Sequence, residues 1–164
     1  MHLPEYINLS HTGELSRRAE ILFSMLESCN ICPKDCFVNR LENKIAACYS
    51  GLLPVVSSYC VHYGEEPLLS GSEQFSNLNG VGNIFFGNCN LRCVYCQNYE
   101  ISQNHKTEIK NEVTIERLAE IMLELQNKNV NAIGFVSPTH FVPQIICALD
   151  IAVKKGLSLP LIYN

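Results

Sequence analysis

The chain has 164 residues, of which 47% are hydrophobic and 17% charged, so its composition supports a buried core and not a disordered segment. The formal net charge of −4, without a long run of Lys and Arg, argues against nucleic acid as a partner. No apolar run reaches the length of a membrane span, and the start lacks a secretion-signal pattern. We therefore expect a cytoplasmic protein that does not bind membranes.

The first predicted element is an amphipathic helix over residues 14–28, in which apolar side chains recur at helical spacing. We expect Thr12 to cap its start. Residues 50–80 are rich in Gly, Ser, Pro and Asn, which indicates ordered loops and short strands. The chain thus divides into an N-terminal helical, cysteine-rich extension with linking loops (residues 1–75) and a second part (residues 76–164).

The second part alternates strands and helices. Short apolar runs at residues 84–86, 130–136 and 159–163 predict strands, and residues 115–126 and 143–155 predict helices between them. Thr114 is the expected cap of the first of these helices, Pro143 opens the second and Gly156 ends it. Strands joined by single helices predict an α/β fold with parallel strands and right-handed crossovers.

This series stops after its third strand. A parallel sheet needs helices on both faces or closure into a barrel, and five elements provide neither. We expect a fragment of a longer chain, whose last strand has an unpaired edge and whose helices are incompletely covered. The alternative is a partner that covers the open edge.

The chain has nine cysteines, and seven of them fall into two tight groups. An odd number of cysteines, an expected reducing compartment and a core-sized apolar content argue against a disulfide framework. Tight grouping is typical of metal ligands. The remaining two, Cys60 and Cys147, are interpreted as packing residues.

The second group is Cys89, Cys93 and Cys96, with the spacing Cys-x3-Cys-x2-Cys directly after the first predicted strand. Three thiolates on one loop can ligate three irons of a cubane and leave the fourth iron open for chemistry. Its place also suits a reactive site, because parallel α/β folds bind ligands at the carboxyl ends of their strands. The alternative is a zinc site with a fourth ligand from elsewhere in the chain.

The first group, Cys29, Cys32, Cys36 and Cys48, supplies four thiols. Four thiolates fit a closed zinc site or a second iron–sulfur cluster, and the spacing does not decide between them. A fully ligated site has no open position, so a structural role is favoured over a catalytic one. Free buried cysteines remain the alternative.

The triad, with Tyr95 inside it and a strand before it, resembles the radical S-adenosylmethionine (SAM) superfamily. A further similarity points to the branch of pyruvate formate-lyase activating enzyme and covers most of the chain. Four segments carry it: residues 62–71 (HYGEEPLLSG), 84–102, 137–144 (SPTHFVPQ) and 159–164 (LPLIYN).

This resemblance implies a partial (βα) TIM-type barrel, a 4Fe–4S cluster on the triad cysteines and S-adenosylmethionine on the open iron. One electron, from a reductant such as flavodoxin or ferredoxin, then cleaves S-adenosylmethionine to methionine and a 5′-deoxyadenosyl radical, which abstracts hydrogen from a substrate. Tyr95 would lie near the adenine.

One motif departs from the family pattern. Many members carry Gly-Gly-Glu-Pro at the end of the second strand, where it holds the amino group of the cofactor. Here that place reads Val136-Ser137-Pro138-Thr139-His140. By position, Ser137, Thr139 and His140 are the candidates for cofactor binding, while His140 equally fits a residue that caps local backbone.

Three functions remain open at this level. The leading one is a radical SAM oxidoreductase that activates a glycyl radical enzyme such as pyruvate formate-lyase. The second keeps the radical chemistry but modifies another peptide or a small molecule. The third is an iron–sulfur or zinc binding fragment without turnover.

Overall fold

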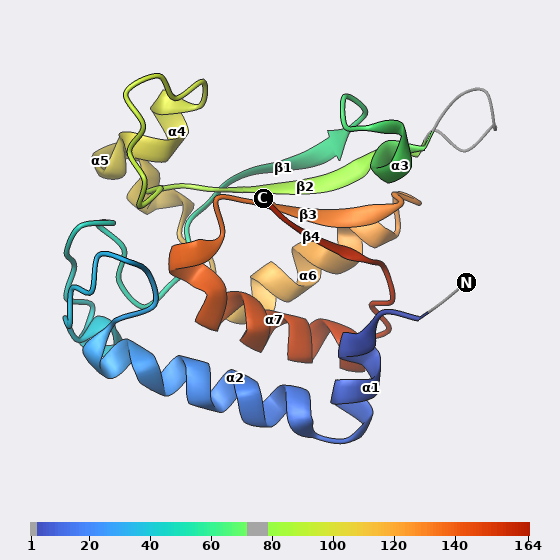
Figure 1. Cartoon of the computed structure of the whole chain (residues 1–164), viewed down its shortest axis with the longest axis horizontal. Helices are drawn as coiled ribbons and strands as arrows, with labels where there is room; N and C mark the ends of the chain where they lie inside the picture. The colour runs from blue at the N-terminus through green and yellow to red at the C-terminus, as the bar shows by residue number, and fades with distance from the viewer. Residues whose placement is uncertain (1–2, 72–78) are drawn as a thin grey trace.

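The computed structural model describes residues 3–71 and 79–164. Within them lies a four-stranded sheet in the spatial order β1 (Val56–His62), β2 (Val81–Phe86), β3 (Ala132–Val136) and β4 (Leu161–Tyr163) (Figure 1). β2, β3 and β4 are parallel, with Phe85 opposite Val136 and Phe135 opposite Tyr163. The α/β class and the parallel strands are therefore confirmed. β1, which runs antiparallel to β2, was not foreseen as a paired strand.

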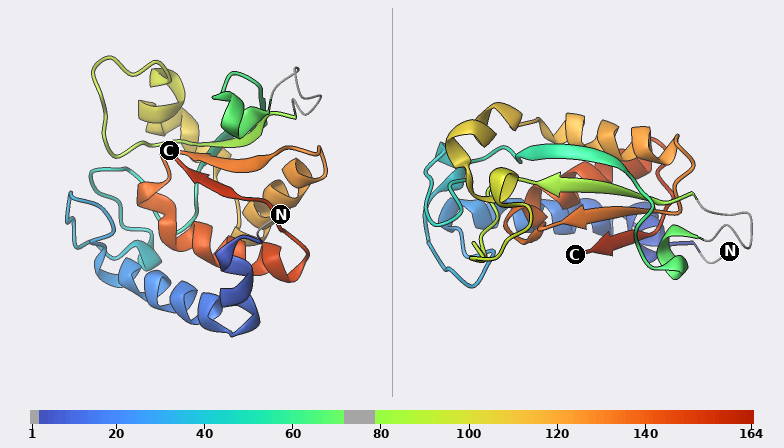
Figure 2. Two further views of the ribbon diagram at one scale, coloured as in Figure 1. Left: turned by 45° about the vertical axis from the view of Figure 1, so that its right-hand side comes forward. Right: turned by 90° about the horizontal axis from the view of Figure 1, so that it is seen from above.

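Two helix layers lie on one face of this sheet (Figure 2). α6 (Ile115–Gln126) and α7 (Val142–Lys154) connect the parallel strands and pack directly on them. α2 (Glu14–Ser24) lies along the outer side of α7, and α1 (Glu5–His11) packs at one end of both. The expectation of incompletely covered helices is wrong for the inner faces, because Leu118 and Met122 of α6 and Ala148 of α7 are fully buried.

Short helical turns fill the connections. They are the 3-10 turns Met25–Ser28, Arg40–Glu42, Ile109–Asn111 and Thr139–Phe141, and the helices α3 (Pro67–Ser70), α4 (Tyr99–Gln103) and α5 (His105–Glu108). The predicted helix over residues 14–28 is confirmed, with its last turn tightened into a 3-10 turn.

The two predicted helix caps had different outcomes. Thr114 caps α6 as expected, its hydroxyl oxygen accepting a hydrogen bond from the Arg117 amide at 3.1 Å. Thr12 does not cap α2, whose N-cap is Gly13 at φ 76°. The unforeseen helix α1 ends at this point, and the Thr12 hydroxyl donates to the carbonyl of Leu9 in its last turn instead.

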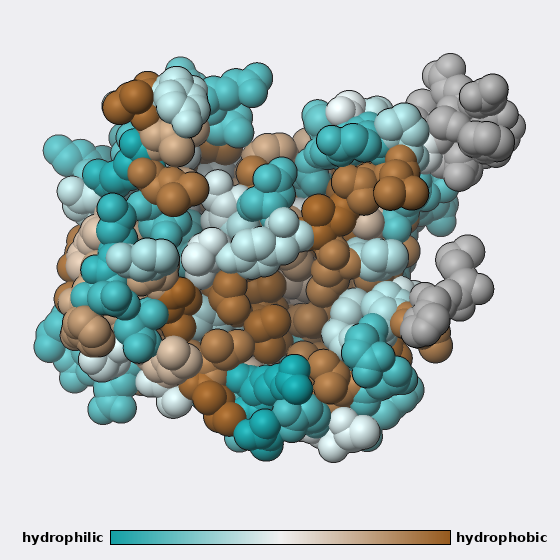
Figure 3. Space-filling model, viewed as in Figure 1, coloured by the Kyte–Doolittle hydropathy of each residue, from teal (hydrophilic) through white to brown (hydrophobic). Residues whose placement is uncertain are grey.

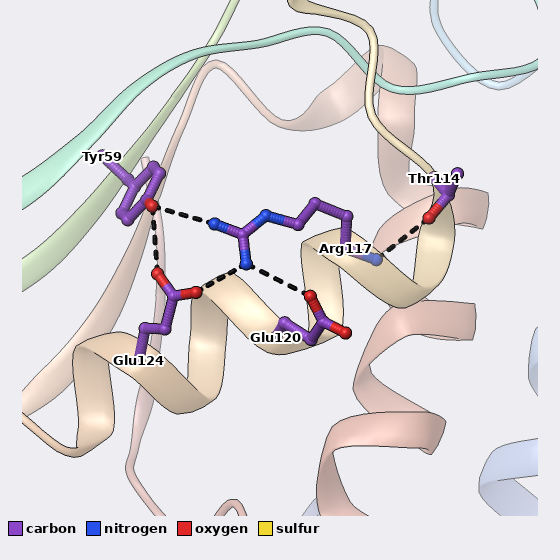
Figure 4. Close-up of polar contacts among 5 residues, drawn as sticks. All are labelled: Tyr59, Thr114, Arg117, Glu120 and Glu124. Atoms are coloured by element: carbon purple, nitrogen blue, oxygen red, sulfur yellow. Dashed lines mark hydrogen bonds and ion pairs between the residues drawn. The ribbon is translucent and has the colours of Figure 1, made fainter.

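A polar network ties β1 to the outer side of α6 (Figure 4). The Arg117 guanidinium donates to the Tyr59 hydroxyl at 3.1 Å and to the carboxylates of Glu120 and Glu124. The Tyr59 hydroxyl in turn donates to Glu124 at 3.0 Å, and this bond raises the pKa of Tyr59. These contacts fix the edge strand β1 to α6.

The sheet is open at β4. An apolar groove of about 140 Å³ runs between this strand and α7, lined by Phe135, Ile145, Leu149 and Leu161 among others, and apolar surface gathers there (Figure 3). The described residues therefore form an open mixed sheet, and its assignment as a partial TIM-type barrel stays a prediction. In these same residues no helix has both the length and the apolar character needed to cross a bilayer.

The predicted boundary between residues 75 and 76 lies outside the described residues. The parts on its two sides pack closely against each other. Leu15 of α2 belongs to the same core as Leu149 of α7, and the Ser16 hydroxyl donates to Asp150 at 2.9 Å. The N-terminal segment therefore shares its core with the strand and helix segment.

Candidate functional site

The triad loop begins where β2 ends. Cys89 follows Phe86 by three residues and is buried, while Cys93 and Cys96 are half-buried. The loop turns sharply, because Asn88 and Arg92 adopt left-handed backbone conformations and the Cys96 amide donates to the carbonyl of Cys93 at 3.2 Å. All three thiols thus lie on one short loop at the carboxyl end of a parallel strand, as predicted.

The residues after the triad hold this loop in place. The Gln103 amide nitrogen on α4 donates to the carbonyl of Cys93 at 3.0 Å, and the Cys96 thiol lies 3.2 Å from the Ser102 hydroxyl. In the described ranges, no three His, Cys, Asp or Glu side chains are already arranged closely enough to hold a metal. The triad still fits an iron–sulfur cluster by the chemistry of its donors, since it offers three thiols from one loop and no competing carboxylate within it.

The predicted cofactor residues divide into two pairs. Ser137 and Thr139 come directly after β3. They lie at the same end of the sheet as the triad, because Val136 of β3 lies opposite Phe85 of β2. Ser137 has a left-handed backbone, and its amide donates to the carbonyl of Asn164 at 2.9 Å. The Thr139 hydroxyl is 2.7 Å from the hydroxyl of Tyr163. Polar groups after β3 and on β4 thus gather at the end of the sheet where the triad loop begins.

Tyr95 and His140 lie differently. Tyr95 is 87% exposed. His140 is 1% exposed, and its Nε2–H donates to the carbonyl of Gly87 at 3.0 Å. Burial lowers the pKa of His140 to about 3, and the neighbouring Arg40 charge acts in the same direction. His140 is therefore neutral, and its ring is bound to the carbonyl of Gly87, which is distant in sequence, and not to the local backbone that the capping alternative named.

The four cysteines of the first group line one small cavity, together with Arg40, Lys34 and His140. Cys29 and Cys48 are buried, and Cys32 and Cys36 are half-buried. The spacing of these cysteines thus predicted their gathering, although, as for the triad, their thiols are not yet at ligand distances.

The two cysteine groups are also neighbours in space, which sequence reasoning missed. The Asn88 side-chain amide donates to the carbonyl of Tyr49 at 3.4 Å, and the Arg92 guanidinium lies 4.3 Å from the centre of the Tyr49 ring. The other missed residue is Arg40, which is 1% exposed. Its position in the sequence between Cys36 and Cys48 could have indicated that Arg40 lies near these cysteines. Charged residues, however, are usually exposed, so its burial was not expected.

The two cysteines outside the groups differ from each other. Cys147 on α7 is half-buried, and burial raises the pKa of its thiol to about 11, which fits the predicted packing role. Cys60 on β1 is exposed, so its interpretation as a packing residue is wrong. The residues directly before and after it on the strand, Tyr59 and Val61, face the core instead.

Comparison with known proteins agrees with the superfamily resemblance that the triad suggests. Residues 83–162 match the family model of the Radical SAM superfamily. Two proteins of Methanocaldococcus jannaschii, both described only as uncharacterized, are similar to this chain. One is 29% identical over 160 residues and 92% of the chain, and the other is 26% identical over 148 residues and 83% of the chain. The chain spans 42% of the length of each relative. No solved structure matches the chain significantly.

Proposed function

We propose that this chain carries the cluster-binding part of a radical SAM oxidoreductase. The observation that carries the proposal is the placement of Cys89, Cys93 and Cys96 on one loop that directly follows a parallel strand, inside the segment that matches the superfamily. On this proposal, residues 76–164 form the radical SAM part and residues 1–75 its cysteine-rich extension.

The residues of the site have separable tasks. The three thiolates of the triad hold a 4Fe–4S cluster by three irons, and Cys89 anchors the loop because it is the buried one. When bound, the cluster supplies the electron that cleaves S-adenosylmethionine into methionine and a 5′-deoxyadenosyl radical. Ser137 and Thr139 offer hydroxyl groups beside the triad, suited to the polar amino acid end of the cofactor.

Tyr95 and His140 take different parts in this proposal. Tyr95 is exposed on the triad loop, where its ring is free to stack on the adenine. His140 takes a positioning role, because its ring supports the carbonyl of Gly87 two residues before Cys89. Of the three candidates for cofactor binding after β3, this leaves Ser137 and Thr139.

The target of the radical is proposed from sequence resemblance alone. The similarity to pyruvate formate-lyase activating enzyme favours a glycyl radical enzyme as partner, and a flavodoxin or ferredoxin as reductant. Radical modification of another peptide or a small molecule is the competing target. A binding fragment without turnover is the third candidate.

Anaerobic reconstitution with iron and sulfide, followed by reduction and addition of S-adenosylmethionine, tests the proposal. We expect formation of 5′-deoxyadenosine, its loss in Cys93→Ala, and its retention in Cys60→Ala, which changes an exposed cysteine outside both groups. A cluster that forms without any cleavage would favour the binding fragment, and transfer of the radical to a polypeptide would identify the first target class.

A further inference from the structure

The four-cysteine segment is folded so that its thiols share one cavity. A hairpin brings Cys29 beside Val38, with the Cys29 amide donating to the Val38 carbonyl at 3.0 Å and the Phe37 amide donating back to Cys29 at 2.9 Å. The Asp35 amide closes the tip by donating to the carbonyl of Cys32 at 3.1 Å. Cys48 returns to this hairpin after the turn at Arg40–Glu42.

The cavity that the four cysteines line is small. The cavity measures about 10 Å³, close to the room that one water-sized sphere needs. Such a space is of the right order for one ion. Four thiolates are a complete tetrahedral set for zinc, with zinc–sulfur distances of about 2.3 Å.

The charges around the cavity also match a zinc–thiolate centre. Arg40 lines the cavity and is 1% exposed, its Nη1 lies 3.8 Å from the sulfur of Cys29, and its Nη2 has no hydrogen-bond partner among the described residues. None of the ion pairs formed by these residues includes Arg40. A buried guanidinium without a carboxylate needs an anion nearby, since an uncompensated buried charge is costly.

A zinc ion with four thiolates is such an anion, carrying two net negative charges. Arg40 and Lys34, which both line the cavity, supply two positive charges. We propose that Cys29, Cys32, Cys36 and Cys48 bind one zinc ion, with Arg40 as its buried counter-charge, and that this centre supports the triad loop. Binding releases the four thiol protons to solvent.

Two connections lead from this zinc centre to the triad loop. The first runs through Arg40, whose Nη1 donates to the carbonyl of His140 at 2.6 Å, and then through the His140 ring to the carbonyl of Gly87. The second runs from Cys48 to its neighbour Tyr49, which contacts the triad loop. Both groups of cysteines thus lie at the same end of the sheet (Figure 1).

Tyr49, Asn88 and Arg92 all have left-handed backbones, with φ between 52° and 57°. Such conformations persist only where the surroundings hold them. Zinc would provide that support from below, while taking no part in the reaction because all its positions are filled. The inference that the zinc centre supports the triad loop rests on the proposed function, whereas the inference that the four cysteines bind zinc does not.

Metal analysis of the full chain tests the zinc centre in the absence of the triad. In the triple variant Cys89→Ala, Cys93→Ala, Cys96→Ala, we expect about one zinc per chain. Adding Cys32→Ser or Cys36→Ser should reduce the content to below about a tenth of that, whereas adding Cys60→Ser should leave it unchanged. No zinc in the triple variant supplied with zinc, or iron with sulfide in its place, would overturn the proposal.

Hydrogen exchange tests the support of the triad loop. In the unsubstituted chain, removing zinc with a chelator should speed exchange of the amides of residues 87–92 by about tenfold or more, and leave the amides in the middle of α6 unchanged. Unchanged exchange at residues 87–92 would refute the coupling. If zinc binds but the triad takes up no cluster, the proposed function fails and the zinc centre stands.

Discussion

Replacing Arg40 with methionine probes the contact between the two cysteine groups. In the structure, Arg40 donates to the carbonyl of Gly51 at 3.0 Å and to that of His140 at 2.6 Å, and its guanidinium lies 5.5 Å from the centre of the Phe141 ring. Methionine keeps much of the length and the apolar character of the side chain but removes the donors. Both carbonyls belong to buried residues and would lose this partner.

The expected loss of stability follows from these contacts. Each carbonyl left without a donor costs about 1–3 kcal/mol. The lost cation–π contact adds about 0.5–1 kcal/mol, and relief from burying a charge offsets part of the total. We therefore expect Arg40→Met to lower the free energy of unfolding by about 2–4 kcal/mol. With an m-value of about 2 kcal/mol per molar urea, the midpoint falls by about 1–2 M.

Urea unfolding with a chelator present, so that metal bonds do not contribute, measures this difference. The matched control is Lys44→Met in the same segment, which loses only an ion pair with Glu42 between exposed side chains and should keep the wild-type midpoint. An Arg40→Met midpoint equal to that of the control, or above wild type, would refute the reasoning that Arg40 holds this segment together.

Three further changes test separate parts of the fold by their effect on the free energy of unfolding. Thr114→Ala should cost about 1 kcal/mol by removing the cap of α6, with Thr12→Ala as a control that leaves the start of α2 unaffected. Gly134→Ala should cost about 1–3 kcal/mol in a thermal melt, because its methyl group would overlap the Asn83 side chain. The pKa of His140 is about 3 in the folded chain and 6.5 for the free group, so the unfolded state binds the proton at a higher pH than the folded state. The free energy of unfolding should therefore fall as the pH drops from 6.5 towards 3, by about 1.4 kcal/mol per pH unit. His140→Gln should remove that part of the pH dependence, and an unchanged slope would contradict it.

The second half of the chain was the more predictable from sequence. Residues 115–126 were predicted as a helix with Thr114 as cap, and the helix has these bounds because capping and an apolar stripe act within a few residues of each other. The parallel order of β2, β3 and β4 follows in the same way from their helical connections.

The pairing of β1 and the whole of α1 were not foreseen, since both are stabilised by partners distant in sequence. β1 lies in a segment whose Gly, Ser and Pro content indicates loops and short strands without fixing their bounds, and it forms by pairing with β2, with Tyr59 opposite Ile84. α1 is only seven residues long and is fixed partly by the Tyr6 hydroxyl, which donates to the carbonyl of Leu159 at 2.6 Å. Burial raises the pKa of Tyr6 to about 12.

The sequence predicted which cysteines are the candidate metal ligands, but not how the two cysteine loops lie relative to each other. Cysteine spacing predicted both groups, because ligands of one metal centre have to lie on short loops. Spacing holds no information on how two loops approach each other in space. The contact of Arg92 with Tyr49 and the burial of Arg40 therefore became visible only in the structure.

The measurement that tests the central claim most directly is the iron and sulfide content of the anaerobically reconstituted chain, compared with that of the variant Cys89→Ala, Cys93→Ala, Cys96→Ala. We predict about four irons and four sulfides per chain that are lost in the triple variant, as expected for a cubane on these thiolates. Equal iron and sulfide in the two proteins would contradict the assignment of the cluster to this loop, and with it the radical chemistry proposed for the chain.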